Sequence, residues 1–315
     1  MQTKKPFLSV IICTYDRINI LAQCLRRIYS QRISDKLFEV VVVDNNSHEE
    51  TRNLILKFQK KYPNIIYSRE NKQGLSHARN NGYLQSKGKY LIYIDDDVFV
   101  PRNYLRSIFA SINKFKPDIL GGPVYPFYKT SKPKWFKNEF EIRKYEKKSG
   151  FSRKCRISGG NFIIKRNLLE KLGKFDTNLG MKGSIIRLGE EAKVLDSYRR
   201  ITPEKKQRVY YSLDCYVKHL VSPEKMKIGY LLKRSFDGGR MSVKMKMLNK
   251  DFSFVGFIIL VVYNLKIIFQ RFFHDLRDLC FHGIKGVDWV VTIRRISFSL
   301  GFVTEGLLKI NYFIK

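Results

Sequence analysis

The sequence predicts an α/β fold with a mostly parallel central sheet flanked by helices, followed by a C-terminal helical extension. Three observations support this. Strand-like and helix-like segments alternate through the first half of the 315-residue chain. The strand-like segments are almost continuously apolar, which is typical of strands covered on both faces. From about residue 223 the pattern changes to helix-like stretches that are apolar and flanked by basic residues.

The individual elements follow from the spacing of apolar residues. The predicted strands are residues 7–13, 38–43, 65–68 and 89–94. The predicted helices are residues 18–30, 49–62, 74–86 and 190–200, with a further helix starting near Pro101. The middle of the chain, about 121–211, is less regular. Its basic and aromatic segment, 125–156, predicts a long loop that contains a helix.

Composition narrows the possible partners. The chain has 60 Lys+Arg against 28 Asp+Glu, a net charge of +32, which favours an anionic partner such as nucleic acid, a phosphorylated metabolite or an acidic membrane. Its five cysteines are scattered and form no Cys-x-x-Cys pair, so a reducing cytosol fits best. No signal peptide precedes the first predicted strand, which also favours the cytoplasm.

Polar clusters follow three of the predicted strands. They are Thr14-Tyr15-Asp16-Arg17, Asp44-Asn45-Asn46-Ser47 and Asp95-Asp96-Asp97. Because ligands of parallel sheets bind at the carboxyl ends of strands, these clusters are expected to meet in one crevice. Three adjacent carboxylates repel one another, and Mg²⁺ or Mn²⁺ is the simplest compensating charge. The alternative for the triplet is an acidic turn that caps the next helix.

These clusters belong to an ordered set of motifs. The set comprises residues 9–17, 41–47, 74–80, 93–97, 159–162, 172–176 and 189–191. In this order, and over about residues 7–240, the chain resembles family-two inverting glycosyltransferases of the GT-A nucleotide-sugar-binding fold, as found in bacterial polysaccharide assembly. The resemblance implies a catalytic domain over residues 1–222, with a nucleotide-binding half of about 1–120 and an acceptor half of about 121–222. Residues 223–315 form the extension.

The resemblance also implies roles for individual residues on the donor side. Nucleotide contacts are expected from Thr14, Tyr15, Arg17, Asp44, Arg79, Asp95 and Asp96. Among these, Asp44 is expected to meet uracil N3–H or the ribose, and its alternative is a residue that only forms a turn. The implied metal ligands are Asp97, Asp95 and His219, for Mn²⁺ or Mg²⁺. The alternative for Arg79 is an exposed surface arginine, and the alternative for His219 is an ordinary core or surface histidine.

Glu190 and Glu191 are the candidates for the catalytic base. A carboxylate within hydrogen-bond reach of a sugar hydroxyl can remove its proton during attack. Relatives usually have Glu-Asp here, with the second acid as base, which implies Glu191 and leaves Glu190 as the alternative. Both residues also suit an acidic first turn of a helix, where the dipole favours negative charge.

The function implied is metal-dependent transfer of a sugar from a nucleoside diphosphate-sugar, UDP-sugar above all, to a hydroxyl of a growing glycan. A lipid-linked acceptor would place the protein on the cytoplasmic face of a membrane. No specific nucleic acid is expected. The competing interpretations are a non-enzymatic basic protein that binds nucleic acid or membrane, and a nucleotidyltransferase. The latter would need a glycine-rich phosphate loop after the first strand.

The extension is the source of the membrane prediction. Residues 225–315 carry 16 Lys+Arg against 6 Asp+Glu, beside an apolar run at 252–269. An apolar helix and neighbouring basic residues are the two signals that together hold a protein on an anionic leaflet. The run can pack on the domain, lie on a membrane or span it, and its apolar part is short for a span.

Overall fold

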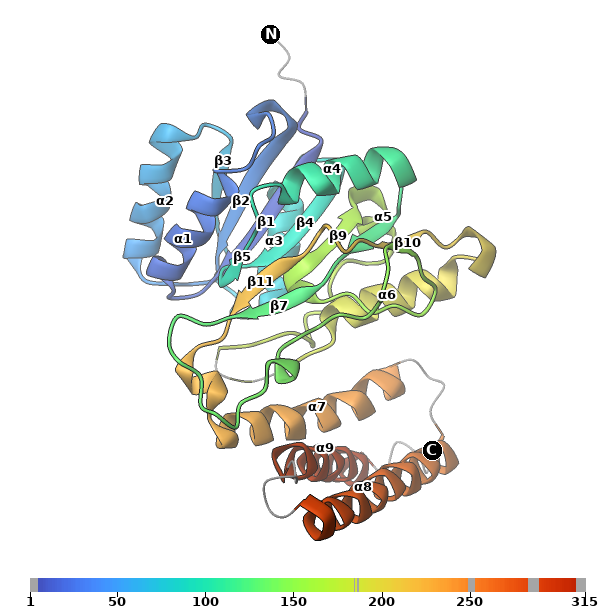
Figure 1. The fold of residues 1–315 in the computed structure, drawn as a ribbon. Helices are drawn as coiled ribbons and strands as arrows, with labels where there is room; N and C mark the ends of the chain where they lie inside the picture. The colour runs from blue at the N-terminus through green and yellow to red at the C-terminus, as the bar shows by residue number, and fades with distance from the viewer. Residues whose placement is uncertain (1–4, 184, 186, 249–252, 283–288, 310–315) are drawn as a thin grey trace. The chain divides into compact units, whose positions relative to one another are not determined.

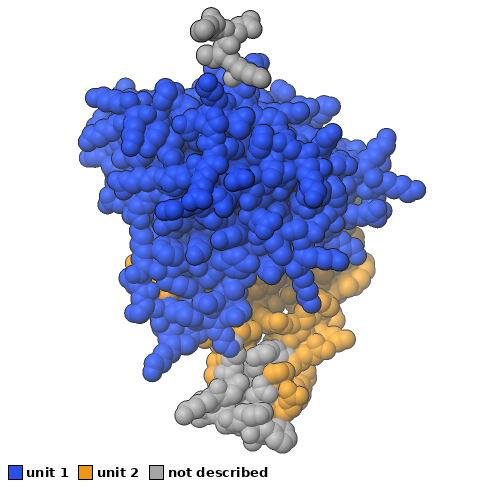
Figure 2. All heavy atoms as spheres, turned by 45° about the horizontal axis from the view of Figure 1, so that its top comes forward, with its two compact units in different colours: residues 1–185, 190–221 blue, residues 186–189, 222–315 orange. Residues whose placement is uncertain are grey.

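The chain forms two compact units in this computed structural model, which describes residues 5–183, 185, 187–248, 253–282 and 289–309. The first unit comprises residues 1–185 and 190–221, and the second comprises residues 186–189 and 222–315 (Figure 2). Every strand within the described ranges belongs to the first unit, and the three long C-terminal helices belong to the second.

The first unit is built on an eight-stranded sheet with the strand order β3-β2-β1-β4-β9-β6-β10-β8 (Figure 1). The pairs of β3, β2, β1 and β4 are all parallel, whereas β9 and β8 pair antiparallel with their neighbours. The strands are β1 (Leu8–Thr14), β2 (Phe38–Asp44), β3 (Ile65–Arg69), β4 (Tyr90–Asp95), β6 (Ile119–Gly121), β8 (Gly150–Phe151), β9 (Phe162–Lys165) and β10 (Val209–Tyr211).

Helices cover both faces of this sheet, as its apolar strands require. The helices are α1 (Ile18–Ile28), α2 (Glu49–Lys61), α3 (Leu75–Gln85), α4 (Tyr104–Phe115), α5 (Arg166–Lys171) and α6 (Glu190–Ile201). Side chains of α1, α2 and α4 pack in the core on one face. Side chains of α3, α5 and α6 pack in the core on the other. The predicted α/β class and the mostly parallel first half of the sheet are therefore confirmed.

A smaller sheet, β5-β11-β7, joins distant parts of the chain. It consists of β5 (Val98–Phe99), β7 (Val124–Phe127) and β11 (Val217–Leu220). The register of β5 and β11 sets His219 opposite Val98, immediately after the aspartate triplet. Residues about 120 positions apart in the sequence are thus brought side by side at the end of β4.

Residues 125–156 form the predicted long loop, but the helix expected within it is only one short 3-10 turn. This turn, Asn138–Phe140, lies between β7 and β8. Phe136 is fully buried here, and the rings of Tyr128, Trp135 and Phe140 pack around it. This aromatic cluster organises the segment without a helical repeat of apolar residues, and Pro126 and Pro133 disfavour a continuous helix.

The second unit contains three long helices, which are α7 (Ile228–Leu248), α8 (Phe254–His282) and α9 (Trp289–Leu308). The helix α9 packs against both α7 and α8. The apolar run predicted at 252–269 is the first part of α8, apart from residue 252, which lies outside the described residues. The helix continues for more than three turns beyond that run, because the following residues keep helical propensity although they become polar.

Candidate functional site

The three polar clusters meet where the central parallel strands end. The register of β1 sets Thr14 opposite Asp44 on β2, and Cys13 opposite Asp95 on β4. Asp16 adopts a left-handed backbone conformation (φ 50°), and its carboxylate accepts a hydrogen bond from the backbone N–H of His48 at 2.9 Å. The loops after β1 and β2 are thereby tied together, and the predicted crevice has a defined edge.

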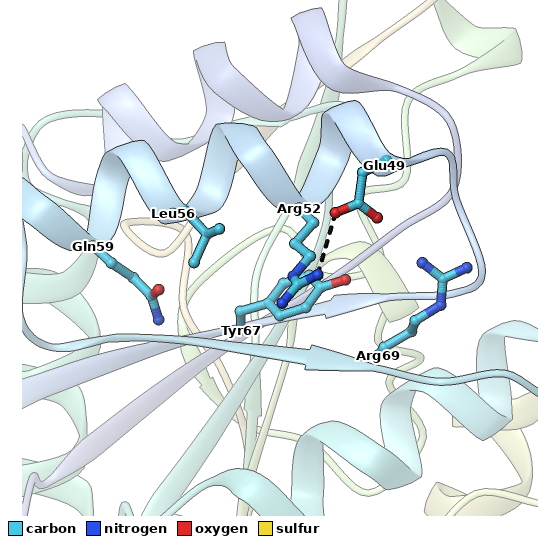
Figure 3. Close-up of a pocket in the computed structure, with 6 residues that line it drawn as sticks. All are labelled: Glu49, Arg52, Leu56, Gln59, Tyr67 and Arg69. Atoms are coloured by element: carbon cyan, nitrogen blue, oxygen red, sulfur yellow. Dashed lines mark hydrogen bonds and ion pairs between the residues drawn. The ribbon is translucent and has the colours of Figure 1, made fainter.

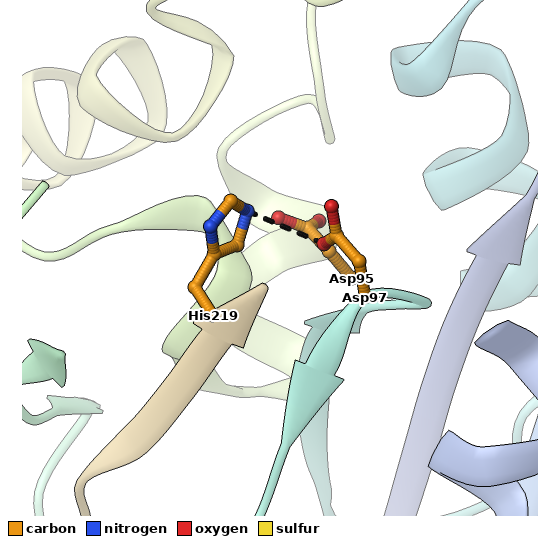
Figure 4. Close-up of side chains that lie close together, drawn as sticks. All are labelled: Asp95, Asp97 and His219. Atoms are coloured by element: carbon orange, nitrogen blue, oxygen red, sulfur yellow. Dashed lines mark ion pairs between the residues drawn. The ribbon is translucent and has the colours of Figure 1, made fainter. Parts of the chain in front are cut away.

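The aspartate triplet divides into two groups. The strand β4 ends at Asp95, and the chain turns through Asp96 and Asp97 before β5 begins. Asp95 and Asp97 lie with His219, and one potential ligand atom from each falls within 4.8 Å of the others (Figure 4). The imidazole Nε2 of His219 lies 3.2 Å from Oδ1 of Asp97. The structure thus brings together the three predicted metal ligands.

Asp96 points away from that group, toward the end of β1. Its Oδ2 accepts a hydrogen bond from the Thr14 hydroxyl at 2.7 Å, and its Oδ1 lies 3.2 Å from the Arg17 guanidinium. Burial, followed by repulsion from Asp97, raises the pKa of Asp96 to about 7, against the opposing effect of Arg17. Arg17 also reaches Oδ2 of Asp97 at 3.3 Å. One exposed arginine therefore links the two groups.

This arrangement fits a divalent cation. Two carboxylates and an imidazole are suitable ligands for Mn²⁺, and the oxygens alone suit Mg²⁺. Asp96 and Asp97 are only 4% and 5% exposed, so their mutual repulsion is poorly screened by water. A cation between Asp95, Asp97 and His219 would add positive charge to that of Arg17, which is half-exposed beside Asp97, and of Arg79, which pairs with Asp95.

Arg79 connects the triplet to the glutamate pair. Its guanidinium, 3% exposed, donates to Glu190 Oε1 at 2.7 Å and to Asp95 Oδ1 at 3.2 Å. The helix α3 carries it, and Gly74 starts that helix in a backbone conformation (φ 145°) that other residues rarely adopt. Both ends of the guanidinium are used within the protein. The contact of Arg79 with the nucleotide stays a prediction. The alternative, an exposed surface arginine, is wrong because the side chain is buried.

The two glutamates at the start of α6 have different surroundings. Glu190 is buried and paired with Arg79, and burial together with the adjacent Glu191 carboxylate raises its pKa while Arg79 opposes the shift. Glu191 is partly exposed, and its Oε1 accepts a hydrogen bond from the Gly159 N–H at 3.2 Å. Glu190 is therefore held in an ion pair, whereas Glu191 is reachable from solvent.

Asp44 is completely buried, and both of its carboxylate oxygens have protein partners. Its Oδ1 accepts from the Ser47 N–H at 2.7 Å, which makes the turn expected of an aspartate there, and its Oδ2 accepts from the Tyr67 hydroxyl at 2.9 Å. The Arg69 guanidinium lies 3.7 Å from Oδ2. The turn-forming role is thus present, and a contact with uracil or ribose stays a prediction. Tyr15 is 42% exposed at the same edge.

Tyr67 and Arg69 also line a cavity of about 480 Å³ between α2 and β3 (Figure 3). The remaining lining residues are Glu49, Arg52, Leu56 and Gln59. None of the predicted site residues lines this cavity. The cavity is linked to the site through Asp44 on β2, because Tyr67 and Arg69 on the neighbouring strand β3 both contact its carboxylate.

Sequence reasoning gave no role to two features that shape the site. A Cβ atom at Gly159 would lie 2.8 Å from Nη2 of Arg79, and one at Gly160 would lie 2.7 Å from Oδ2 of Asp95. The adjacent glycines therefore let the backbone pack directly on both side chains. Tyr67 was also missed, although its place on a strand next to β2 was predictable. The signal would have been the register of β3, which pairs Asp44 with Arg69.

Replacing Tyr67 with phenylalanine is expected to lower the free energy of unfolding by about 1.5–3 kcal/mol, because a hydrogen bond to a buried carboxylate is lost. Urea denaturation measures this change. Tyr128→Phe is the matched control, since its hydroxyl makes an exposed hydrogen bond to Asn138, and it should stay within about 0.5 kcal/mol of wild type. Equal effects of the two substitutions would contradict the special role of Tyr67.

Comparisons with known proteins agree with this geometry. The chain is 28% identical to glycosyltransferase AglE of Haloferax volcanii over 189 residues, which cover 59% of this chain and 61% of AglE. It is 27% identical to the glucosyl-dolichyl phosphate glucuronosyltransferase of the same organism, covering 72% and 74%. A GalNAc(5)-diNAcBac-PP-undecaprenol beta-1,3-glucosyltransferase of Campylobacter jejuni is 29% identical, covering 52% and 53%. The chain thus matches less than two thirds of the length of AglE and of the Campylobacter enzyme.

Solved structures show the same fold. The mannosyltransferase PcManGT from Pyrobaculum calidifontis, in complex with GDP-Man and Mn²⁺, aligns with a TM-score of 0.59 at 15% identity, over 96% of this chain and 88% of that one. S. aureus TarS 1–349 in complex with UDP aligns with a TM-score of 0.54 at 17% identity, over 96% and 91%. At these identities the likeness concerns the fold alone.

A family model described as glycosyl transferase family 2 matches residues 9–173, which is more than half of the chain. This stretch includes most of β1, the whole aspartate triplet and the Gly159–Gly160 turn. The motifs from residues 9–17 to 159–162 lie within it, whereas the glutamate pair at 190–191 lies beyond it. The chain therefore belongs to glycosyl transferase family 2 and has the GT-A fold, as its sequence motifs predict.

Proposed function

We propose that this glycosyltransferase moves a sugar from a nucleoside diphosphate donor, UDP-sugar above all, to a hydroxyl of a glycan, with inversion at the sugar carbon. The observation that carries the proposal is the separation of two acidic groups by one buried arginine. Asp95 lies on one side of Arg79 with the candidate metal ligands, and the glutamate pair lies on the other. Such a site can stabilise the leaving group at one acidic group and activate the nucleophile at the other.

The donor side would bind the diphosphate through a divalent cation. Asp95, Asp97 and His219 would hold Mn²⁺ or Mg²⁺, which supplies charge to stabilise the departing nucleoside diphosphate. Arg17, half-exposed beside Asp96 and Asp97, is placed to add positive charge at the same edge. The nucleoside would lie over the ends of β1 and β2, near Thr14, Tyr15 and Asp44.

On the acceptor side, Glu191 would accept the proton of the attacking hydroxyl. Its partial exposure allows an acceptor to approach, and the Gly159 N–H fixes one of its oxygens. Glu190 is the weaker candidate, because its Oε1 is already in a 2.7 Å ion pair with Arg79. Glu190 would instead position Arg79, and through it Asp95.

The acceptor is proposed to be a lipid-linked glycan, made at the cytoplasmic face of a membrane during cell-envelope polysaccharide synthesis. Two relatives support this by name, since one is a dolichyl phosphate and the other a PP-undecaprenol glycosyltransferase. The net charge of +32 favours an anionic membrane surface. Residues 1–222 would be the catalytic domain, with the donor bound by about 1–120 and the acceptor by 121–222. A non-enzymatic basic protein would leave the buried acidic site without a role.

A thermal-shift screen of nucleotide-sugars tests the donor assignment. At a concentration 100-fold above Kd, a ligand stabilises the fold by about 2.7 kcal/mol, so the Tm should rise on the order of 5 °C with a UDP-sugar and Mn²⁺. GDP- and CMP-sugars are the matched comparisons, and chelation of Mn²⁺ should remove most of the shift. A larger shift with another nucleotide-sugar would change the assigned nucleobase of the donor, and no shift with any of them would contradict the proposal.

A further inference from the structure

The helix α8 has the reverse of the polarity expected in a water-soluble bundle. Within the second unit, most of its exposed side chains are large and apolar, although Lys266, Gln270 and His274 are exposed among them. The apolar side chains at least 44% exposed are Val255, Ile258, Ile259, Val262, Tyr263, Leu265, Phe269, Phe272 and Phe273. They recur at helical spacing, so they form a continuous stripe. Exposed apolar stripes of this length mark an interaction surface.

The polar residue Asn264 of α8 contacts α9. The Asn264 amide donates to the Leu260 carbonyl at 2.7 Å, and its Oδ1 lies 3.4 Å from the Ser299 hydroxyl on α9. Phe257, beside it, is 3% exposed and stacks on Phe302 of α9. A polar contact between helices combined with an apolar exterior is typical of helices surrounded by lipid.

The helix α9 repeats the pattern. Its buried side chains are mostly small or polar, namely Thr292, Ser299, Gly301, Phe302, Glu305 and Gly306. Leu300, Leu307 and Leu308 are instead 56–67% exposed. Glu305, 2% exposed, forms ion pairs with Arg240 at 2.8 Å and Lys244 at 3.5 Å on α7. The Glu305 carboxylate is therefore paired with cations inside this unit, whereas these three leucines are exposed.

Small residues also set the contact between α7 and α9. A Cβ atom at Gly301 would lie 2.0 Å from the Phe236 carbonyl oxygen, and one at Gly239 would lie equally close to that of Phe298. The two backbones therefore touch, as in helix pairs that associate through small residues in membranes. Backbone proximity and ion pairs add to a small apolar core in which Val243, Phe257 and Phe302 are buried together. The exposed apolar side chains of α8 named above lie outside that core.

We propose that the outer faces of α8 and α9 insert into an anionic lipid bilayer. The segment Phe254–His274 is apolar enough to cross a membrane by length and composition, with a mean hydropathy of 1.6. Apolar helices of soluble cores pass the same test but are mostly buried, whereas 6% of the most apolar window is buried here. The basic excess of residues 225–315 complements acidic head groups and distinguishes this surface from a site for a second copy, which would carry the same charge.

The inserted helices lie in the interface, although Phe254–His274 is long enough to cross a bilayer. Lys266 and Gln270 are exposed within that segment, and polar side chains facing the hydrocarbon core are costly. Lys266 is exposed on α8 and Arg295 is exposed on α9. Their long side chains can reach the head groups only when the helices are shallow. This inference names the surface behind the membrane localisation proposed above and rests on that localisation.

Vesicle flotation of the full-length protein tests the inference. Wild type should float with vesicles containing phosphatidylglycerol and stay bound after a wash at high salt, because apolar insertion is not screened. The double substitution Ile259→Asp and Val262→Asp should lower the bound fraction at least ~10-fold, since carboxylates in the apolar layer are costly. Leu84→Asp is the matched control, an exposed leucine of the first unit at 62%, and should float like wild type.

Three outcomes would overturn the inference. One is a wild-type protein that releases at high salt, which would mean adsorption by charge alone. Another is an aspartate variant that floats as wild type does. The third is that neither protein floats and the variant only changes the oligomeric state in size-exclusion chromatography. Mn²⁺-dependent hydrolysis of the UDP-sugar, measured on the same samples, keeps the two proposals apart. Hydrolysis without flotation rejects the lipid surface but leaves the proposed enzyme activity standing.

Discussion

Replacing Glu191 with glutamine is expected to lower turnover by ~10²–10⁴ while donor affinity stays nearly unchanged. Glutamine keeps the size of the side chain and can still accept the hydrogen bond from the Gly159 N–H. It cannot take a proton from the attacking hydroxyl. Steady-state transfer to a glycan acceptor measures kcat, and calorimetric titration with UDP and Mn²⁺ measures the affinity of the folded variant.

Two further variants show whether this loss is specific. Glu204→Gln changes an exposed carboxylate paired with Arg153 and should leave turnover unaltered. Glu190→Gln should act mainly on stability, because it leaves the buried Arg79 guanidinium without one of its two anionic partners. Near-normal turnover of Glu191→Gln would place the base elsewhere. A large kcat loss in Glu190→Gln without any loss of stability would make Glu190 the base.

Replacing Asp97 with alanine is expected to abolish metal-dependent donor binding. This carboxylate, 5% exposed, contributes to the cluster with Asp95 and His219 and also meets Arg17. Without it, one carboxylate and one imidazole remain, which supply too little negative charge to hold a divalent cation on the protein. The electron paramagnetic resonance signal of free Mn²⁺ measures this directly, because the signal weakens when the ion binds.

The control for this variant is Asp35→Ala, which removes an exposed carboxylate outside the site. It should bind Mn²⁺ like wild type in the presence of UDP. His219→Ala should weaken Mn²⁺ binding less than Asp97→Ala, because a neutral ligand is removed and both carboxylates remain. Unchanged Mn²⁺ binding by Asp97→Ala would remove the residue from the metal site.

Much of the fold of residues 1–120 was predictable from the sequence because its signals are local. Buried parallel strands such as residues 38–43 and 89–94 are nearly pure apolar runs, and they became β2 and β4 with boundaries shifted by one residue. Since parallel strands end at one edge, the polar residues after them had to converge. The grouping of Asp95 with Asp97, apart from Asp96, would follow from side-chain alternation if the strand continued, but β4 ends at Asp95 and the turn through Asp96 and Asp97 produces this grouping instead.

The features that were missed depend on contacts between distant residues. The burial of Arg79 needs α6 to bring Glu190 across from 111 positions away in the sequence. The close approach of Gly159 is visible only once the guanidinium is in place. In residues 125–156, packing around Phe136 decided the conformation, and local helix propensity did not. The exposure of α8 also required the structure, because an apolar run alone does not show whether a helix is buried.

The central claim is a division of labour, in which the aspartate cluster binds the donor through a metal and Glu191 activates the acceptor. Calorimetric titration of UDP into wild type, Asp97→Ala and Glu191→Gln, each with and without Mn²⁺, tests it most directly. Glu191→Gln should keep the wild-type gain in affinity on adding Mn²⁺, and Asp97→Ala should show no gain. An equal loss of the Mn²⁺ effect in both variants, or its retention in both, would contradict the account.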